Sequence, residues 1–404
     1  MDKIIIQPVL VGGDLNCYSV ARAYHEAYGV KSIAFGRYEL GATKDSNIID
    51  FRVEPKITEE EKFIQVLLDT ADELSEPNKK LIIMGCTDEY AELIIDHKDI
   101  LKDKYIVPYI DKDLKNKLIE KELFYQMCEE YGLDYPKTHI FNKGNEVCDF
   151  GFKYPVILKA SDSISFFQNA FEGMKKAYLI KDADEFKKVT DEIYSHGYEK
   201  SMIVQEYIPG DDSHMRVLTC YSDQNGKVKM MCLGHVLLEE HTPKGIGNHA
   251  AIITEYDKAL MEKFKSFLES INYTGFSNFD IKFDKRDNTY KVFEINLRQG
   301  RSNYYVTSSG NNIAKYIVED RVYNKELDLK IQKDPFFWHV IPRNIVYKYV
   351  KDEELVNKAK QLAKEGNSAT SFGYDKDLKG NFKRRLYLFL YGINQMRKFK
   401  KYCK

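Results

Sequence analysis

The chain has 404 residues, of which 43% are hydrophobic, and its 61 basic and 62 acidic residues give a net charge of -1. This length is sufficient for two to three domains with buried cores, and the balanced charge excludes a global attraction to nucleic acid. The seven cysteines form neither CxxC pairs nor a small disulfide framework, and we expect four in apolar or strand-like runs to be reduced core residues of a cytosolic protein: Cys17, Cys86, Cys220 and Cys232.

The first part of the chain, residues 1–110, alternates predicted strands and helices, which is typical of a Rossmann-like α/β unit. Strands are expected at 4–11, 32–35 and 81–84. The turn Gly12-Gly13-Asp14 precedes a helical stretch that ends at Tyr28. A glycine turn at a helix N-terminus can receive a ligand. Since the full dinucleotide-binding fingerprint is missing, a plain structural turn is the favoured interpretation.

The middle of the chain, residues 111–330, changes to a mixed pattern. Helices are expected over 111–132 and 183–195, and strands over 154–160 and 202–208. We interpret the polar and aromatic segment 161–176 as a mobile loop. Further elements are expected in this order: strands at 214–221 and 228–238, a glycine-containing loop at 242–249, and a helix near 257–270.

A predicted hairpin is the most informative part of the sequence. One strand, 275–284, contains Asp280, and the next, 290–298, contains Glu294, Asn296 and Arg298 at a spacing of two. Side chains two apart on a strand point to the same face. The hairpin therefore presents two carboxylates, an amide and a guanidinium on one surface. Mg²⁺ is commonly bound by only a few side-chain oxygens and takes its remaining ligands from phosphate groups. We therefore predict a site for a nucleotide and a metal ion.

The chain after residue 330 is expected to be a C-terminal extension with an unusual end. From Lys379 onward it contains no acidic residue. Two interpretations stay open: this segment rests on an anionic membrane surface, or it is a helix packed on the body with a solvated basic face. Its basic and bulky apolar residues are Lys383, Arg384, Arg385, Arg397, Lys398, Lys400 and Lys401, among Phe382, Leu386, Leu388, Phe389, Leu390 and Phe399.

Four landmarks in order resemble the ATP-grasp superfamily of carboxylate–amine ligases over residues 110–320. They are Lys121, Lys159, the strand 204–208 followed by acids, and Asp280 with Glu294-x-Asn296-x-Arg298. The resemblance implies an α/β, multi-domain fold in which a Rossmann-like domain, 1–110, precedes an ATP-grasp domain, 111–330. Within that domain, 150–205 would be a nucleotide lid and 206–330 a metal-binding part, and 331–404 would follow as the extension.

A closer resemblance, to the D-aspartate ligase family, covers the whole chain. It includes Phe35-Gly36, Val107–Asp111, Tyr131–Thr138 and Lys159–Ser163. Members of this family attach D-aspartate to the lysine side chain of peptidoglycan precursors. The resemblance implies ATP and Mg²⁺, with two ions, as cofactors. The cysteines indicate a cytoplasmic location, and in the first interpretation of the C-terminal segment residues 379–404 would lie at the inner face of the membrane. Two other hypotheses are a ligase for another amino acid or peptide, and a nucleotide-binding module without turnover.

The resemblance also implies roles for single residues. Lys121 and Lys159 match lysines that contact ATP phosphates, and Ser161 and Ser163 stand where many members carry glycines over these phosphates. Glu206 and Ile208 match the hinge that reads adenine, and Asp211 or Asp212 matches the acid that meets the ribose. Asp280, Glu294 and Asn296 match the Mg²⁺ ligands, and Arg298 matches the arginine that stabilises the acyl phosphate. Candidates for substrate contact, each with a plain ion-pair or polar-turn alternative, are Arg301, Arg216, Lys282, Asn248 and His249.

Overall fold

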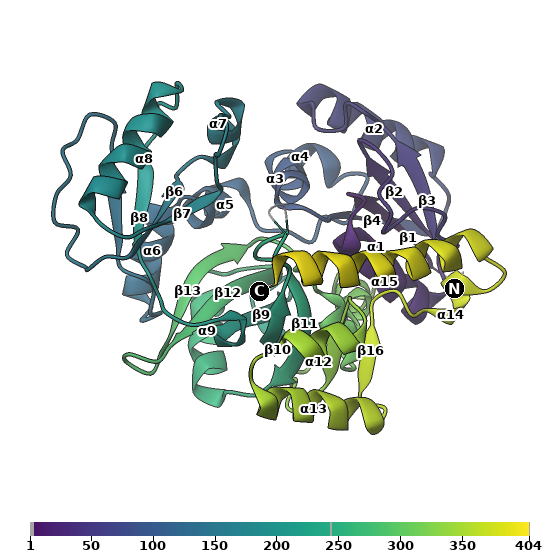
Figure 1. Cartoon of the computed structure of the whole chain (residues 1–404). Coiled ribbons are helices and arrows are strands. Elements are labelled where there is room, and N and C mark those ends of the chain that lie inside the picture. Colours follow the sequence, from purple (N-terminus) through teal and green to yellow (C-terminus); the bar gives the residue numbers. More distant parts are fainter. Residues whose placement is uncertain (1–3, 243–244, 404) are drawn as a thin grey trace. The chain divides into compact units, whose positions relative to one another are not determined.

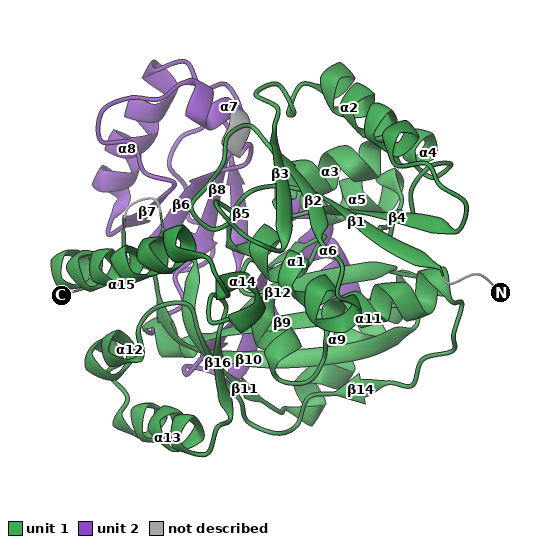
Figure 2. Ribbon diagram, turned by 90° about the vertical axis from the view of Figure 1, so that its right-hand side faces the viewer, with its two compact units in different colours: residues 1–120, 211–281, 294–404 green, residues 121–210, 282–293 purple. Residues whose placement is uncertain are grey.

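The computed structural model describes residues 4–242 and 245–403 and divides into two compact units (Figure 2). Unit 1 comprises Met1–Glu120, Asp211–Ile281 and Glu294–Lys404, and unit 2 comprises Lys121–Gly210 and Lys282–Phe293. The expected α/β class is confirmed, because helices and strands are interspersed along the chain and the strands form three separate sheets (Figure 1). The three-part division at residues 110 and 330 stays a prediction.

The N-terminal sheet of unit 1 is parallel and has the strand order β3-β2-β1-β4. Three of its strands lie where the sequence predicts them, and β3 was not predicted. The strands are β1 (Ile5–Val11), β2 (Ser32–Gly36), β3 (Ile49–Val53) and β4 (Lys79–Gly85). The accompanying helices are α1 (Leu15–Tyr28), α2 (Glu60–Glu73), α3 (Asp88–Asp96), α4 (Lys98–Leu101) and α5 (Lys112–Ile119).

The turn between β1 and α1 has a definite structural cause. Gly12 has φ 138°, and a Cβ there would lie 2.7 Å from the Cβ of Cys86, so only glycine fits. Asp14 then caps α1, because its carboxylate accepts hydrogen bonds from the backbone N–H groups of Asn16 and Cys17. The cysteines expected in the core, including Cys17 and Cys86, are buried.

The large sheet of unit 1 has eight strands, of which seven follow the order β13-β12-β9-β10-β11-β15-β16, and β14 pairs with β10. The end of β12, the connecting turn and the first part of β13, Lys282–Phe293, are assigned to unit 2. The predicted hairpin is confirmed as β12 and β13, joined by a turn in which Asn288 has φ 55°. The strands are β9 (Met215–Ser222), β10 (Val228–Glu239), β11 (His249–Glu255), β12 (Gly275–Asp284), β13 (Thr289–Asn296), β14 (Lys330–Ile331), β15 (Phe337–His339) and β16 (Ser368–Thr370).

Helices complete unit 1 around a core that includes the fully buried Trp338. None of the helices in the described residues combines the length and hydrophobicity needed to span a bilayer. They are α9 (Lys258–Ser270), α10 (Tyr304–Ser308), α11 (Ile313–Ile317), α12 (Arg343–Tyr349), α13 (Glu353–Lys364), α14 (Asp375–Leu378) and α15 (Phe382–Tyr402), with a 3-10 turn at Asp212–His214 and a π turn at Val318–Val322.

Unit 2 is built on an antiparallel sheet with the order β5-β8-β6-β7. One difference from the sequence analysis concerns the expected loop 161–176, which contains the short helix α7. Asp162 caps this helix by accepting from the N–H of Ser165. The elements are β5 (Thr138–Phe141), β6 (Val156–Ala160), β7 (Ala177–Ile180), β8 (Met202–Glu206), α6 (Lys121–Glu130), α7 (Ser163–Gln168) and α8 (Ala183–Ser195).

A buried ion pair joins the start of α15 to α14, and the same arginine binds the N-terminal part of unit 1. The Nε of Arg384 lies 3.2 Å from Asp377 Oδ2, and both side chains are 0% exposed. The guanidinium also donates to the carbonyls of Gly41, Ala42 and Lys44. The sequence pattern grouped Arg384 with the basic residues of an exposed segment. The structure corrects this, because Arg384 is buried.

Removing Arg384 should destabilise the protein strongly. We expect Arg384→Met to lower the free energy of unfolding by about 3–5 kcal/mol, because it leaves the buried Asp377 carboxylate without its cation. Urea unfolding measures this, and Arg385→Met, at the exposed neighbouring position, is the matched control. Adding Asp377→Asn to Arg384→Met should restore part of the loss. Equal losses for the Arg384 and Arg385 variants would contradict the structural role.

Candidate active site

The hairpin β12–β13 brings together the three predicted metal ligands. The amide nitrogen of Asn296 donates to Asp280 Oδ2 at 3.3 Å and to the carbonyl of Asn278 at 3.2 Å. Because the nitrogen makes these bonds, the amide oxygen is the atom that a cation would meet. The carboxylate of Glu294 lies close enough to Asp280 to alter its titration. Their proposed role as metal ligands stays a prediction.

The electrostatics of this group suit a bound cation. Burial, and then the negative charges of Glu294 and Glu239, raise the pKa of Asp280 to about 8, although Asn296 and Arg298 act to lower it. A cation would relieve this accumulation of negative charge. Within the described residues, no group of three or more His, Cys, Asp or Glu side chains could hold a metal alone. The donor set fits Mg²⁺, which commonly takes its remaining oxygens from phosphate and water.

Arg298, just after β13, is held among acids of unit 1. Its Nη2 donates to Asp88 Oδ2 at 2.9 Å, and its Nη1 donates to the carbonyl of Gln299 at 2.9 Å. The Nε atom is buried and finds no acceptor among the described residues. A buried donor of this kind calls for an explanation, and an anionic ligand is the one that suits a guanidinium.

Arg301 repeats the same arrangement. Its Nη2 donates to Glu240 Oε1 at 3.1 Å, whereas its buried Nη1 finds no acceptor in the described part of the chain. Burial raises the pKa of Asp14, and the charges of Arg301 and Arg298 oppose this rise. Two arginines, each with a buried free donor, therefore lie around the acid that caps α1.

Sequence reasoning missed the acids that surround these arginines. Asp14 and Asp88 follow β1 and β4, which are adjacent parallel strands of one sheet. Ligands of such sheets bind outside the carboxyl ends of the strands, so acids just after two predicted strands were a usable signal. Glu239 and Glu240, at the end of β10, gave no comparable signal.

Two of the proposed substrate residues lie where the glycine-containing loop meets β11: Asn248 ends the loop and His249 begins the strand. His249 is buried, and burial together with the charge of Arg301 lowers its pKa to about 4. At neutral pH it is therefore uncharged, although its Nε2 lies 3.7 Å from Glu239 Oε1. The backbone of Asn248 closes a turn with Gly245 and accepts from the N–H of Glu240. Neighbouring residues 243 and 244 of this loop lie outside the described part.

The other two substrate candidates have structural partners. Arg216 forms an ion pair with Glu255 and donates to the carbonyls of Ser213 and Met215, as expected of a residue that joins β9 to β11. Lys282, in unit 2, donates to the carbonyl of Gly210 at 3.1 Å. These contacts favour the plain structural interpretation for both residues.

Unit 2 holds most of the residues expected to bind ATP. At the end of β6, Lys159 donates to Gln205 Oε1 at 3.0 Å, and Lys121 is the first residue of α6. Glu206 accepts from Arg286 at 2.7 Å, a partner that the sequence did not indicate. Ile208 is buried, and the hydroxyl of Ser161 accepts from Ser201. The side chain of Ser163 lies outside the described part of the structure.

Asp211 and Asp212, the two ribose candidates, both belong to unit 1 and both stabilise turns. Asp211 accepts from the N–H and hydroxyl of Ser213. Asp212 accepts from the N–H of Glu239 at 2.9 Å and lies 2.8 Å from Nε2 of His241. The contact with Glu239 ties Asp212 to the end of β10, next to the acids of the candidate site. The choice between the two acids stays open.

Comparison with known proteins gives one relative of nearly full length. The chain is 42% identical over 406 residues to a D-aspartate ligase of Enterococcus faecium (strain Aus0004), an alignment that covers 98% of this chain and 96% of the relative. No protein-family model matches.

Two solved structures show a similar fold. An L-amino acid ligase from Bacillus licheniformis has a TM-score of 0.53 at 14% identity, with 79% of this chain and 71% of that chain covered. The biotin carboxylase domain of the Hydrogenobacter thermophilus 2-oxoglutarate carboxylase, in complex with MgADP, ADP and bicarbonate, has a TM-score of 0.60 at 13% identity, covering 82% of this chain and 72% of that chain.

Proposed function

Since the chain belongs to the D-aspartate ligase family and has the ATP-grasp fold, we propose that this ligase joins the β-carboxylate of D-aspartate to the lysine side-chain amine of a peptidoglycan precursor. The acceptor we propose is UDP-MurNAc-pentapeptide. ATP would phosphorylate the carboxylate, and the amine would displace phosphate from the acyl phosphate to form the amide. The products are the amide, ADP and phosphate.

The observation that supports this proposal best is the pair of buried arginine donors. Arg298 Nε and Arg301 Nη1 find no acceptor in the described residues, and both arginines lie in unit 1 with the acids of β12 and β13. A carboxylate and its acyl phosphate are both anions. Guanidinium groups stabilise the negative charge that develops in the transition state between the two. We assign Arg298 to the reacting group because it follows the metal-ligand strand directly.

We assign Arg301 to the second carboxylate of aspartate. Its free Nη1 would donate to that group, and His249, which is neutral at pH 7 because its pKa is lowered to about 4, could add an uncharged hydrogen bond. The carboxylates of Glu239 and Glu240, next to these residues, suit the ammonium group of an amino acid. This combination of positive and negative side chains fits aspartate, which carries one ammonium group and two carboxylates.

ATP and Mg²⁺ are the cofactors we propose, with two ions. Asp280, Glu294 and Asn296 would hold Mg²⁺, which supplies neutralisation of phosphate charge when it is bound. The lysines of unit 2 would contact phosphates, and the remaining assignments follow the family resemblance: Lys121, Lys159, Ser161, Ser163, Glu206, Ile208, and Asp211 or Asp212. We propose a cytoplasmic location, with residues 379–404 as the segment that meets the inner face of the membrane.

The reaction is tested by ADP release from purified protein with Mg-ATP, across D- and L-amino acids, with and without the pentapeptide. We expect release that requires both D-aspartate and the pentapeptide, with a product heavier by one aspartyl residue in mass spectrometry. Release that requires a different acid would replace the substrate but keep the ligase chemistry. Tight ATP binding without release for any acid would contradict the proposed reaction.

A further inference from the structure

The C-terminal helix α15 has two unlike faces. Its inner face packs on unit 1 through the buried side chains of Arg384, Gln395 and Phe399. On the opposite side, Phe382, Leu386, Phe389 and Leu390 are 84%, 60%, 66% and 53% exposed. Their spacing of four, three and one residues places them along one stripe of a helix. We refer to these four residues as the outer face of α15.

Positive charges border this outer face. Lys383 and Arg385 flank its first half, and three exposed cations continue along the last turns of the helix: Arg397, Lys400 and Lys401. No acid occurs from Lys379 to the end of the chain, so nothing within this segment neutralises them. The structure agrees with a packed helix that exposes basic side chains, and it adds an apolar stripe that is exposed beside them.

An exposed cluster of large apolar side chains usually marks a binding surface. Two classes of partner must be compared, a second copy of this chain and a lipid surface. A two-fold pairing of α15 with itself would bring the same five cations face to face, and like charges repel. An anionic bilayer instead offers acyl chains to the apolar stripe and negative headgroups to its basic border.

We propose that α15 is a membrane-docking helix that lies in the plane of an anionic bilayer, with Phe382, Leu386, Phe389 and Leu390 inserted at the headgroup boundary. The five bordering cations contact the headgroups. This inference is independent of the ligase reaction, because it depends only on the surface of α15.

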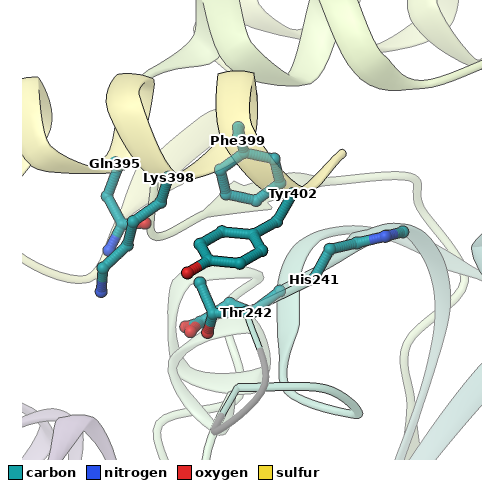
Figure 3. A pocket seen from close by; sticks show the side chains of 7 residues that line it. His241, Thr242, Gln395, Lys398, Phe399 and Tyr402 are labelled. Carbon is teal, nitrogen blue, oxygen red and sulfur yellow. The ribbon is translucent and has the colours of Figure 1, made fainter. Parts of the chain in front are cut away.

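The inner face shows which part of unit 1 such docking brings to the membrane. At the C-terminal end of α15, Gln395, Lys398, Phe399 and Tyr402 line a small hollow together with Glu240, His241 and Thr242 (Figure 3). Glu240 is the acid that accepts from Arg301. Docking through α15 therefore holds the loop beside the candidate substrate arginine close to the bilayer.

Flotation of the full-length protein with liposomes tests the proposal. We expect binding to vesicles that contain phosphatidylglycerol, weak binding to pure phosphatidylcholine, and loss of binding at high salt. The double variant Leu386→Gln/Phe389→Gln should bind these vesicles with an affinity lowered by roughly tenfold or more. A charge variant, Lys383→Gln/Arg385→Gln/Lys400→Gln/Lys401→Gln, should lose binding to a similar degree.

The matched control is Ile100→Gln/Ile119→Gln, which removes two comparably exposed apolar side chains, at 47% and 41%, from another part of unit 1. It should bind vesicles as the unchanged protein does. The melting temperature and vesicle-free ADP release of all variants should stay unchanged, which separates docking from folding and from the reaction. Equal binding to both lipids, or none to either, would overturn the proposal. So would a dimer in sedimentation velocity that the Leu386/Phe389 variant abolishes.

Discussion

Replacing Glu294 with glutamine should lower ADP release by more than about a hundredfold at saturating Mg-ATP, because loss of even an outer partner in a metal site costs about 10- to 100-fold. The substitution keeps the size of the side chain and removes one anionic ligand. A second readout does not need turnover. Burial and the charge of Glu294 raise the pKa of Asp280 to about 8, so in metal-free Glu294→Gln this pKa should fall, although burial keeps it above its usual value. Carboxyl-carbon NMR titration measures it.

The control for this experiment is Glu262→Gln, the same chemical change at an exposed surface position on α9. It should leave both ADP release and the titration of Asp280 unchanged. If Glu294→Gln releases ADP at the normal rate, Glu294 is not a metal ligand. If the rate falls but the pKa of Asp280 stays at about 8, the charge of Glu294 does not raise that pKa as we infer.

Replacing Arg298 with lysine should lower kcat by about 100- to 1000-fold, as does removal of one preorganised donor from other charge-stabilising sites. Lysine keeps the positive charge beside Asp88 but has no counterpart of the Nε donor, which is buried without an acceptor in the described residues. Because the charge stays, we expect only a small change in the free energy of unfolding. Steady-state kinetics with varied D-aspartate measure kcat and KM separately.

Two further arginine-to-lysine variants make this result specific. Arg301→Lys should mainly raise the KM for D-aspartate, since we assign this residue to the second carboxylate rather than to the reacting one. Arg321→Lys is the matched control, because Arg321 is also half-buried, pairs with Asp320, and has a buried Nη2 without an acceptor in the described part of the chain, but lies outside the candidate site. It should leave both kinetic constants unchanged. Similar losses in all three variants would indicate a general effect of removing a guanidinium.

Local patterns account for what the sequence predicted well. The hairpin with Asp280, Glu294 and Asn296 was visible because side chains alternate along strands with a period of two. The bond between Asn296 and Asp280 confirms that these two residues meet. The strands of the N-terminal sheet were visible as short apolar runs, except β3, in which Asp50 and Arg52 interrupt the apolar pattern. The helix at 183–195 was predicted with the observed bounds because its amphipathic period is strong.

The sequence by itself determined which residue types stand in the hairpin, in the arginine-bearing segment after it and in the acid-free C-terminal helix. Only the tertiary structure decided their partners. Arg298 meets Asp88 across 210 positions of the chain, and Arg216 is paired with Glu255 because β9 and β11 flank β10 in the sheet. The tertiary structure also decided which face of α15 points outward, because it buries Arg384 against Asp377. Periodicity reports a residue's neighbours along the chain, whereas packing between distant segments sets the charge and burial that give a side chain its chemistry.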